Sequence, residues 1–233
     1  MKSAPFRTLI GFLTLLACAF AAAEQQTPQQ RVFQIKSTLA ASKQALMQYQ
    51  WIETQTLSLN GEQKSQTVNR CYYGPDGAVQ KMQLSTTPPA PKKPGLRGEI
   101  QAKEEADLKT YLQNAVALAH SYAPPDPGLL QAAVGSGNLA VVPQPNQAVR
   151  LTFSNYLKSG DSLAIDVDLT DNRLLDANVA SYMDTPDQAV TLAVTWGILP
   201  NGISYVSNVT LNAPAKKVTV TVQNADYVQV APQ

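Results

Sequence analysis

Four aspartates lie close together in the chain: Asp166, Asp168, Asp171 and Asp176. Hard cations such as Ca²⁺ need several oxygen ligands, but this spacing lacks the turn glycine and the final glutamate of the helix-loop-helix calcium motif. Two carboxylates could also share acid and base chemistry, yet no neighbouring residue distinguishes an acid from a base. Residues two apart in a strand share one side. We therefore expect a solvated strand face at Asp166 and Asp168 and a turn at Asp171.

The segment Gly160-Asp161-Ser162-Leu163 spells the signature of the GDSL hydrolases, in which the serine is the nucleophile. In that family the block lies near the start of the domain, and a DxxH pair near the end supplies the base. Here no histidine follows Ser162, and a serine hydroxyl without a base is a weak nucleophile. Because Gly-Asp-Ser is also ordinary turn chemistry, the segment predicts a hairpin between two strands.

Beyond residue 23 the chain has one cysteine, Cys71, and one histidine, His120. Cys71 lies in a segment that reads as a strand, so we expect it to be a small buried hydrophobe. A catalytic thiol would need an activating partner, and His120 is about fifty positions away, in the last turn of a predicted helix. One histidine and one cysteine without ligand spacing predict no metal site, and we expect no cofactor.

The charge balance argues against nucleic acid as a partner. Of 18 basic residues, Lys2 and Arg7 lie in the first 23 positions, which leaves 16 against 17 acidic ones. Nucleic acid or an anionic membrane surface would require a clustered basic excess. The glycosylation sequon at Asn208 lies inside a predicted strand. Low charge, sixteen prolines and abundant Thr, Gln, Asn and Val indicate a β-rich protein that works outside the cytoplasm.

The elements that must position these residues begin with a helix over 31–50, whose apolar residues fall mostly on one broad face. The hydrophobic period then changes to two over 51–59, 64–73 and 78–86, which predicts three strands. Asn60-Gly61 and the turn at 74–77 place glycine where a positive φ is needed. An antiparallel meander follows.

A second helix is predicted from Glu99 to about Tyr122, after an exposed proline-rich loop at 87–97. The apolar residues of this helix form a stripe along one face, and acidic residues lie near its N-terminus, the positive end of the helix dipole. Residues 126–147 are mixed, with a short helix at 128–134 and then a connection rich in Gly, Ser and Pro.

From Ala148 onward, apolar and polar residues alternate, so each strand has one apolar face. With the meander this gives about nine antiparallel strands. Two substantial helices must bury their apolar stripes, and the apolar face of a curled sheet accepts them. The sequence therefore predicts an α+β fold: a half-barrel of about nine strands with two main helices on its apolar face, in a single domain over 24–233.

The first 23 residues are typical of a secretory signal peptide. Lys2 and Arg7 form a basic start, 9–20 is almost wholly apolar, and Ala21-Ala22-Ala23 precedes a polar run. We expect cleavage after Ala23 and an exported, periplasmic protein without a transmembrane helix in its mature chain. The alternative is lipidation at Cys18, because Leu15-Leu16-Ala17-Cys18 approximates a lipoprotein box, and this would give a lipid-anchored envelope protein.

The order of elements resembles the periplasmic lipoprotein-carrier fold, that of the LolA-like carriers and LolB-like acceptors. The resemblance runs from the N-terminal helix through the meander at Tyr49 to Gly77, the intervening helix and the strands that end at Val218 to Val230. It implies a half-barrel sheet closed by helices around an apolar cavity. It matches no family signature or ligand-binding arginine to particular positions, so no functional residue is carried over.

Two functions from different classes follow. The first is an exported, non-enzymatic binding or carrier protein with an apolar pocket for a lipid or a lipid-modified partner such as a lipoprotein. Its candidate lining residues are Phe153, Leu192, Trp196 and Val220, which could equally form a filled core. The second is a structural or interaction module of the cell envelope that offers the proline-rich loop and a sheet edge to another envelope protein. No catalytic residue is identified.

Overall fold

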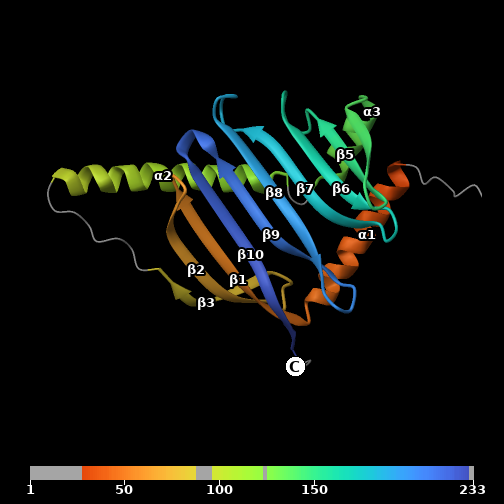
Figure 1. Cartoon of the computed structure of the whole chain (residues 1–233), viewed down its shortest axis with the longest axis horizontal. Coiled ribbons are helices and arrows are strands. Elements are labelled where there is room, and N and C mark those ends of the chain that lie inside the picture. The colour runs from red at the N-terminus through yellow and green to blue at the C-terminus, as the bar shows by residue number, and fades with distance from the viewer. Residues whose placement is uncertain (1–27, 88–95, 123–124, 231–233) are drawn as a thin grey trace, which may run out of the picture.

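The computed structural model describes residues 28–87, 96–122 and 125–230. Ten strands form one antiparallel sheet in the order β3-β2-β1-β10-β9-β8-β7-β6-β5-β4, so β3 and β4 are its two edges (Figure 1). The strands are β1 (Tyr49–Leu59), β2 (Glu62–Tyr73), β3 (Val79–Thr86), β4 (Leu139–Gln144), β5 (Ala148–Ser154), β6 (Ser162–Asp168), β7 (Arg173–Tyr182), β8 (Ala189–Ile198), β9 (Ser204–Ala213) and β10 (Val218–Gln229).

The N-terminal meander is confirmed. β1 pairs with β2 and β2 with β3, both antiparallel, as the turn sequences predict. Asn60 and Gly61 have φ values of 55° and 78°, the left-handed pair that a tight two-residue hairpin requires. Gly77 has a φ of 71° in the second turn. Glycine and asparagine at these positions hold the register of the first three strands.

One strand more is present than the sequence indicated. It is β4, which contains Pro143 and lies at the sheet edge beside β5. A proline lacks a ladder donor, so it is tolerated at an edge, and its presence disguised this strand as a connection. The short helix before it is confirmed as α3 (Pro127–Gly135), which begins after Asp126, whose side chain caps two backbone N–H groups.

The two long helices are α1 (Pro28–Leu46) and α2 (Leu96–His120), and both end earlier than expected. α1 stops four residues before the predicted end at Gln50, because Tyr49 already belongs to β1, where its side chain is buried. α2 begins within the expected loop at 87–97, of which 88–95 lie outside the described residues. The predicted leader over 1–23, with Cys18, also lies outside them.

The predicted α+β arrangement is confirmed. In the view of Figure 1, α1 and α2 lie behind the sheet, and α3 lies at the end that carries β5. A cluster of buried residues, most of them from the strands, forms the core. Partly buried side chains of all three helices pack against it: Ile35, Leu39, Tyr111, Leu118, Ala119, Leu129 and Val134. The sheet does not close into a barrel, since its two edge strands are not neighbours. The half-open sheet with helices on one face is the arrangement that the carrier-fold resemblance implies.

β10 joins the two halves of the sheet. It pairs with β1, from the start of the chain, and with β9, which precedes it in sequence. The meander of β1, β2 and β3 is therefore attached to the other strands through β10. Among the described residues, no helix combines the length and the apolar character that crossing a membrane requires.

Candidate functional site

The four predicted lining residues do not share one pocket. Phe153 and Leu192, with 1% and 6% of their surfaces exposed, belong to the packed core between sheet and helices. Trp196 and Val220 are only partly buried, and each lines a different pocket. The structure thus places two of the four in solid core and two at openings on the helix-covered side of the sheet.

The pocket that includes Val220 is an apolar groove of about 590 Å³ between α2 and the β1–β10 pair. The sheet contributes Leu57 and Val220, which are cross-strand partners. The α2 helix contributes the remaining lining residues, which are Glu105, Leu108, Lys109, Leu112, Gln113 and Val116. We call this pocket the apolar groove.

The groove is unfilled because α2 only partly packs on the sheet. Residues 102–107 are all exposed, and Figure 1 shows the first part of α2 extending beyond the strands. Ala115 is fully buried further along the helix, where α2 meets the core. Between these two regions Leu108 and Leu112 are half-buried, and Val116, which follows Ala115, is 39% exposed. Their apolar stripe, which the sequence predicted in part, therefore faces an incompletely filled space.

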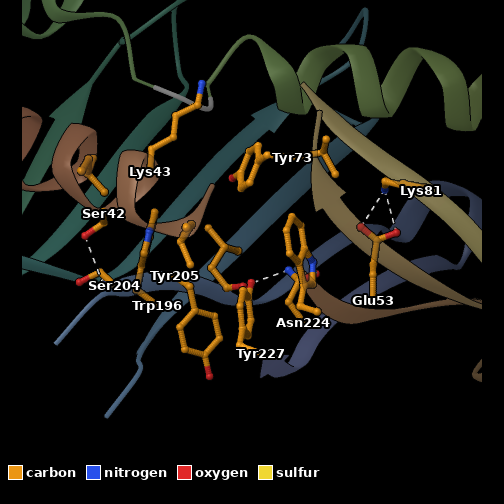
Figure 2. Close-up of a pocket in the computed structure, with 15 residues that line it drawn as sticks. Ser42, Lys43, Glu53, Tyr73, Lys81, Trp196, Ser204, Tyr205, Asn224 and Tyr227 are labelled. Carbon is orange, nitrogen blue, oxygen red and sulfur yellow. Dashed lines mark hydrogen bonds and ion pairs between the residues drawn. The ribbon is translucent and has the colours of Figure 1, made fainter. Parts of the chain in front are cut away.

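The pocket that includes Trp196 measures about 420 Å³ and lies between α1 and the other end of the β1–β10 pair. We call it the aromatic pocket, because five of its lining side chains are aromatic: Trp51, Tyr73, Trp196, Tyr205 and Tyr227 (Figure 2). These rings come from five different strands. The α1 helix closes one side with Leu39, Ser42, Lys43 and Leu46.

A bulge in β10 sets the position of the rings. Tyr49 and Gln50 pair with Gln229 and Val228, but Ile52 pairs with Ala225, so Trp51 faces two residues of β10. One of them, Asp226, has a φ of 53°. The next residue, Tyr227, stacks on Trp51 with 5.4 Å between ring centroids and 10° between planes. The extra residue thus places Tyr227 against the Trp51 ring.

Two further ring contacts extend this cluster. The Tyr73 ring lies 5.4 Å from Trp51, and the Tyr205 ring lies 4.5 Å from Tyr227. The indole N–H of Trp51 donates to Asn224 Oδ1 at 3.0 Å, and Asn224 Nδ2 donates to the Val206 carbonyl at 3.0 Å. Burial raises the pKa of both Tyr73 and Tyr227, so these phenols are neutral hydrogen-bonding groups at physiological pH.

An ion pair forms the polar wall of the aromatic pocket. Lys81 Nζ lies 2.7 Å from each oxygen of the buried Glu53 carboxylate, and Asn69 Nδ2 donates to Glu53 Oε1 at 3.1 Å. Cys71 lies beside this group, opposite Trp51 on β2, and is fully buried. Burial, together with the Glu53 carboxylate, raises the pKa of the Cys71 thiol to about 11. The thiol is therefore protonated at neutral pH, in agreement with its predicted role as a buried hydrophobe.

The two pockets lie along one face of the same strand pair. Three cross-strand pairs follow one another at intervals of two residues: Glu53 with Asn224, Gln55 with Val222, and Leu57 with Val220. Residues two apart share a face of a sheet, so all three pairs point to the same side. The first pair lines the aromatic pocket, the last lines the apolar groove, and Gln55 between them is exposed. An open surface therefore connects the two pockets.

The aspartates predicted to form a solvated strand face are instead paired with arginines. Asp166 is buried and accepts two hydrogen bonds from Arg150, at 2.7 and 2.6 Å. Arg173 Nη2 lies 2.9 Å from both Asp168 and Asp171. Sequence reasoning missed these pairs because the cross-strand neighbours were unknown. Among the described residues, no three His, Cys, Asp or Glu side chains gather where they could hold a metal ion.

The predicted hairpin joins β5 to β6 through residues 155–161, and both Asp161 and Leu163 are buried. Tyr122 Oη donates to Asp161 Oδ2 at 2.5 Å and lies 2.8 Å from Ser181 Oγ. The backbone N–H groups of Leu157 and Lys158 also donate to Asp161 Oδ2. Burial, with the hydrogen bond to Asp161, raises the pKa of Tyr122. Asp161 therefore links Tyr122, two residues after the end of α2, to the hairpin. His120 lies exposed in the last turn of that helix.

Comparison with known proteins finds similar solved structures but no family model and no curated protein that matches the chain. The crystal structure of a DUF1329 family protein from Desulfovibrio piger ATCC 29098 is similar with a TM-score of 0.37 and 10% identity, over 86% of this chain and 95% of that chain. The crystal structure of a LolA superfamily protein from Nitrosomonas europaea is similar with a TM-score of 0.32 and 8% identity, over 85% of this chain and 94% of that chain.

Proposed function

We propose that this protein is a non-enzymatic binding or carrier protein that holds the hydrocarbon part of a lipid, or of a lipid-modified partner, in the apolar groove. The observation that carries the proposal is the groove itself, in which the stripe of α2 faces Leu57 and Val220 across about 590 Å³ of unfilled space. That volume lies within the range of roughly 300–1,000 Å³ for small-molecule sites. Each methylene buried there would contribute about 0.8 kcal/mol.

The state of the reactive side chains supports binding rather than catalysis. The Cys71 thiol is buried with a raised pKa, Asp166 and Asp168 are paired with arginines, and Asp161 binds a tyrosine and two backbone amides. Each of these groups has a structural partner or environment. An apolar ligand needs none of them, because burial of its surface supplies the free energy.

We also propose that the mature protein works in the periplasm of a bacterial envelope. The basic start and apolar run before Ala23 support export, and a cleaved chain would begin at Glu24. Lipidation at Cys18 would instead tether the protein to the membrane. The mass of the mature protein, isolated from the envelope of its own cells, distinguishes the two N-termini. A protein that retains residues 1–23 unprocessed in the cytoplasm would contradict both.

The test of the carrier function is the binding of a fluorescent fatty acid by the purified mature protein. The variant Leu112→Glu replaces an apolar lining side chain with a carboxylate, which removes apolar contact area and places a charge where the hydrocarbon would lie, and we expect affinity to fall at least tenfold. Asn114→Glu is the matched control, because Asn114 is exposed on the same helix and does not line the groove. A folded wild-type protein that binds no fatty acid, or equal affinity in Leu112→Glu, would refute the proposal.

A second function, an interaction module of the envelope, is supported by the edge strand β3. All eight of its residues are exposed, and Met82 and Leu84 expose 53% and 47% of their surfaces. An open edge with exposed apolar residues can accept a strand from another protein. In this case a ligand-free protein would be purified repeatedly with one envelope protein, and Leu84→Lys would abolish that association while fatty-acid binding stays absent.

A further inference from the structure

We infer that the aromatic pocket binds the sugar ring of a glycosylated lipid whose hydrocarbon chain lies in the apolar groove. The inference rests on the proposed function and specifies the class of ligand. Its basis is the continuous face that joins the two pockets through the pairs Glu53–Asn224, Gln55–Val222 and Leu57–Val220. Successive strand residues rise by about 3.3 Å, so the two ends of this face are about 13 Å apart. That separation suits a ligand with a polar head and an extended chain.

The aromatic side chains match one property of a sugar ring. A pyranose has flat apolar C–H faces and a rim of hydroxyl groups. Figure 2 shows Tyr73 and Trp196, which come from different strands, among the side chains that line the pocket. Trp51 and Tyr227 also line it and form a stacked pair. Aromatic rings supply large apolar area to the C–H faces while their phenol and indole groups remain able to form hydrogen bonds. A hydrocarbon chain alone could not form hydrogen bonds with the polar groups that line this pocket.

The free hydrogen-bonding groups match the hydroxyl rim. Ser42 Oγ accepts from the Ser204 backbone N–H at 3.3 Å and keeps its own proton to donate. The Lys81 ammonium has three protons, of which Glu53 engages two. The Asn224 side chain makes one hydrogen bond through each of its polar atoms and retains one donor and one acceptor site. Hydroxyl groups both donate and accept, so they can use this mixture.

The charges argue against an ionic head group. Glu53 is the one carboxylate among the lining residues, and Lys81 and Asn69 already engage it, so a quaternary ammonium would find no free anion. An anionic head could pair with Lys43, but that side chain is exposed on α1, where an ion pair contributes little because water screens it. A charge that leaves water without a buried partner loses hydration free energy, whereas a neutral glycosyl group does not carry that cost.

The test compares three ligands by calorimetric titration below their critical micelle concentrations: decyl maltoside and decyl phosphocholine, whose alkyl chains have ten carbons, and decanoate, whose ten carbons include the carboxyl carbon. We expect the maltoside to bind at least tenfold more tightly than the other two. Tyr73→Leu, which removes an aromatic ring and a hydroxyl from the pocket, should reduce that advantage to twofold or less and leave decanoate affinity unchanged. Trp196→Leu should act in the same direction. Tyr72→Leu is the control, because Tyr72 is exposed and lines neither pocket.

The outcomes separate the two claims. If none of the three ligands binds the folded protein, the proposed function fails. If decanoate binds but the maltoside has no advantage, or if Tyr73→Leu and Trp196→Leu both keep that advantage in folded protein, the inference about the sugar fails while the carrier function stands. Tighter binding of decyl phosphocholine would overturn the choice of a neutral head group. Thermal melting by circular dichroism establishes that each variant is folded.

Discussion

The Asp161 carboxylate is buried and receives three hydrogen bonds on one oxygen, from Tyr122 and from the backbone of Leu157 and Lys158. The sequence predicted the hairpin correctly, but the recognisable motif drew attention to Ser162, because nothing in the sequence links Asp161 to a tyrosine 39 positions before it. A phenol has one proton, which Tyr122 donates to Asp161, so Ser181 must donate to Tyr122 Oη. Local sequence could not reveal this chain of three side chains.

At this scale we predict that Tyr122→Phe lowers the free energy of unfolding by about 1–3 kcal/mol, because buried Asp161 loses one of its three hydrogen bonds and buried Ser181 loses its hydrogen bond to the phenol. Urea denaturation followed by circular dichroism measures the change. Tyr72→Phe is the matched control, since Tyr72 is 42% exposed, and we expect a change within about 0.5 kcal/mol. Equal stabilities of Tyr122→Phe and the wild type would show that this network contributes nothing.

Elements with a strong period were predictable, including the edge strand β3, whereas the other edge strand, β4, was not. The alternation in β5 and β6 placed those strands correctly, because one face of each is buried in the core. β4 was missed, because Pro143 and two exposed valines, Val141 and Val142, give it no buried face to reveal. The bulge at Asp226 was also not predictable, because a positive φ at an aspartate leaves no hydrophobic pattern. Consequently the sequence indicated the sheet but not the aromatic pocket that this bulge shapes.

At the scale of the element, the ring of Tyr205 on β9 lies so close to Gly197 in β8 that a larger residue would not fit at position 197. The two residues are cross-strand partners, and a Cβ at position 197 would lie 2.7 Å from Tyr205 Cζ. We predict that Gly197→Ala lowers the free energy of unfolding by about 1–3 kcal/mol, because the ring must move or the strands must separate.

Chemical denaturation measures this loss, and Gly135→Ala serves as its control. Gly135 ends α3, and no atom lies within 4 Å of a Cβ built there, so alanine should fit without strain. The double variant Gly197→Ala with Tyr205→Ala should be less destabilised than the sum of its single changes, because the clash is absent. Strict additivity of the two changes would contradict the proposed contact.

On the scale of the whole molecule, the decisive feature is a pairing between the two ends of the described chain. β1 and β10 are separated by more than 150 residues, and no local pattern announces that they are neighbours. The residues predicted to line a pocket illustrate how the site depends on this pairing. Trp196 and Val220 could be chosen as apolar strand residues, but the groove and the aromatic pocket exist only because β10 inserts between β1 and β9. The class of fold was therefore accessible from sequence, whereas the position of the site was not.

This dependence gives a prediction for Thr221, which lies in the middle of β10 between Thr56 of β1 and Thr210 of β9 and lines neither pocket. Thr221→Pro removes a ladder donor from an interior strand, and we expect a loss of about 3 kcal/mol or more in the free energy of unfolding. Fatty-acid binding should fall with it, because both walls of the groove on the sheet come from the β1–β10 pair. Thr221→Ser keeps the backbone donor and should preserve both properties. If Thr221→Pro retained stability and binding, the meander would not depend on β10 for its attachment, and the groove would have to be held by α2 alone.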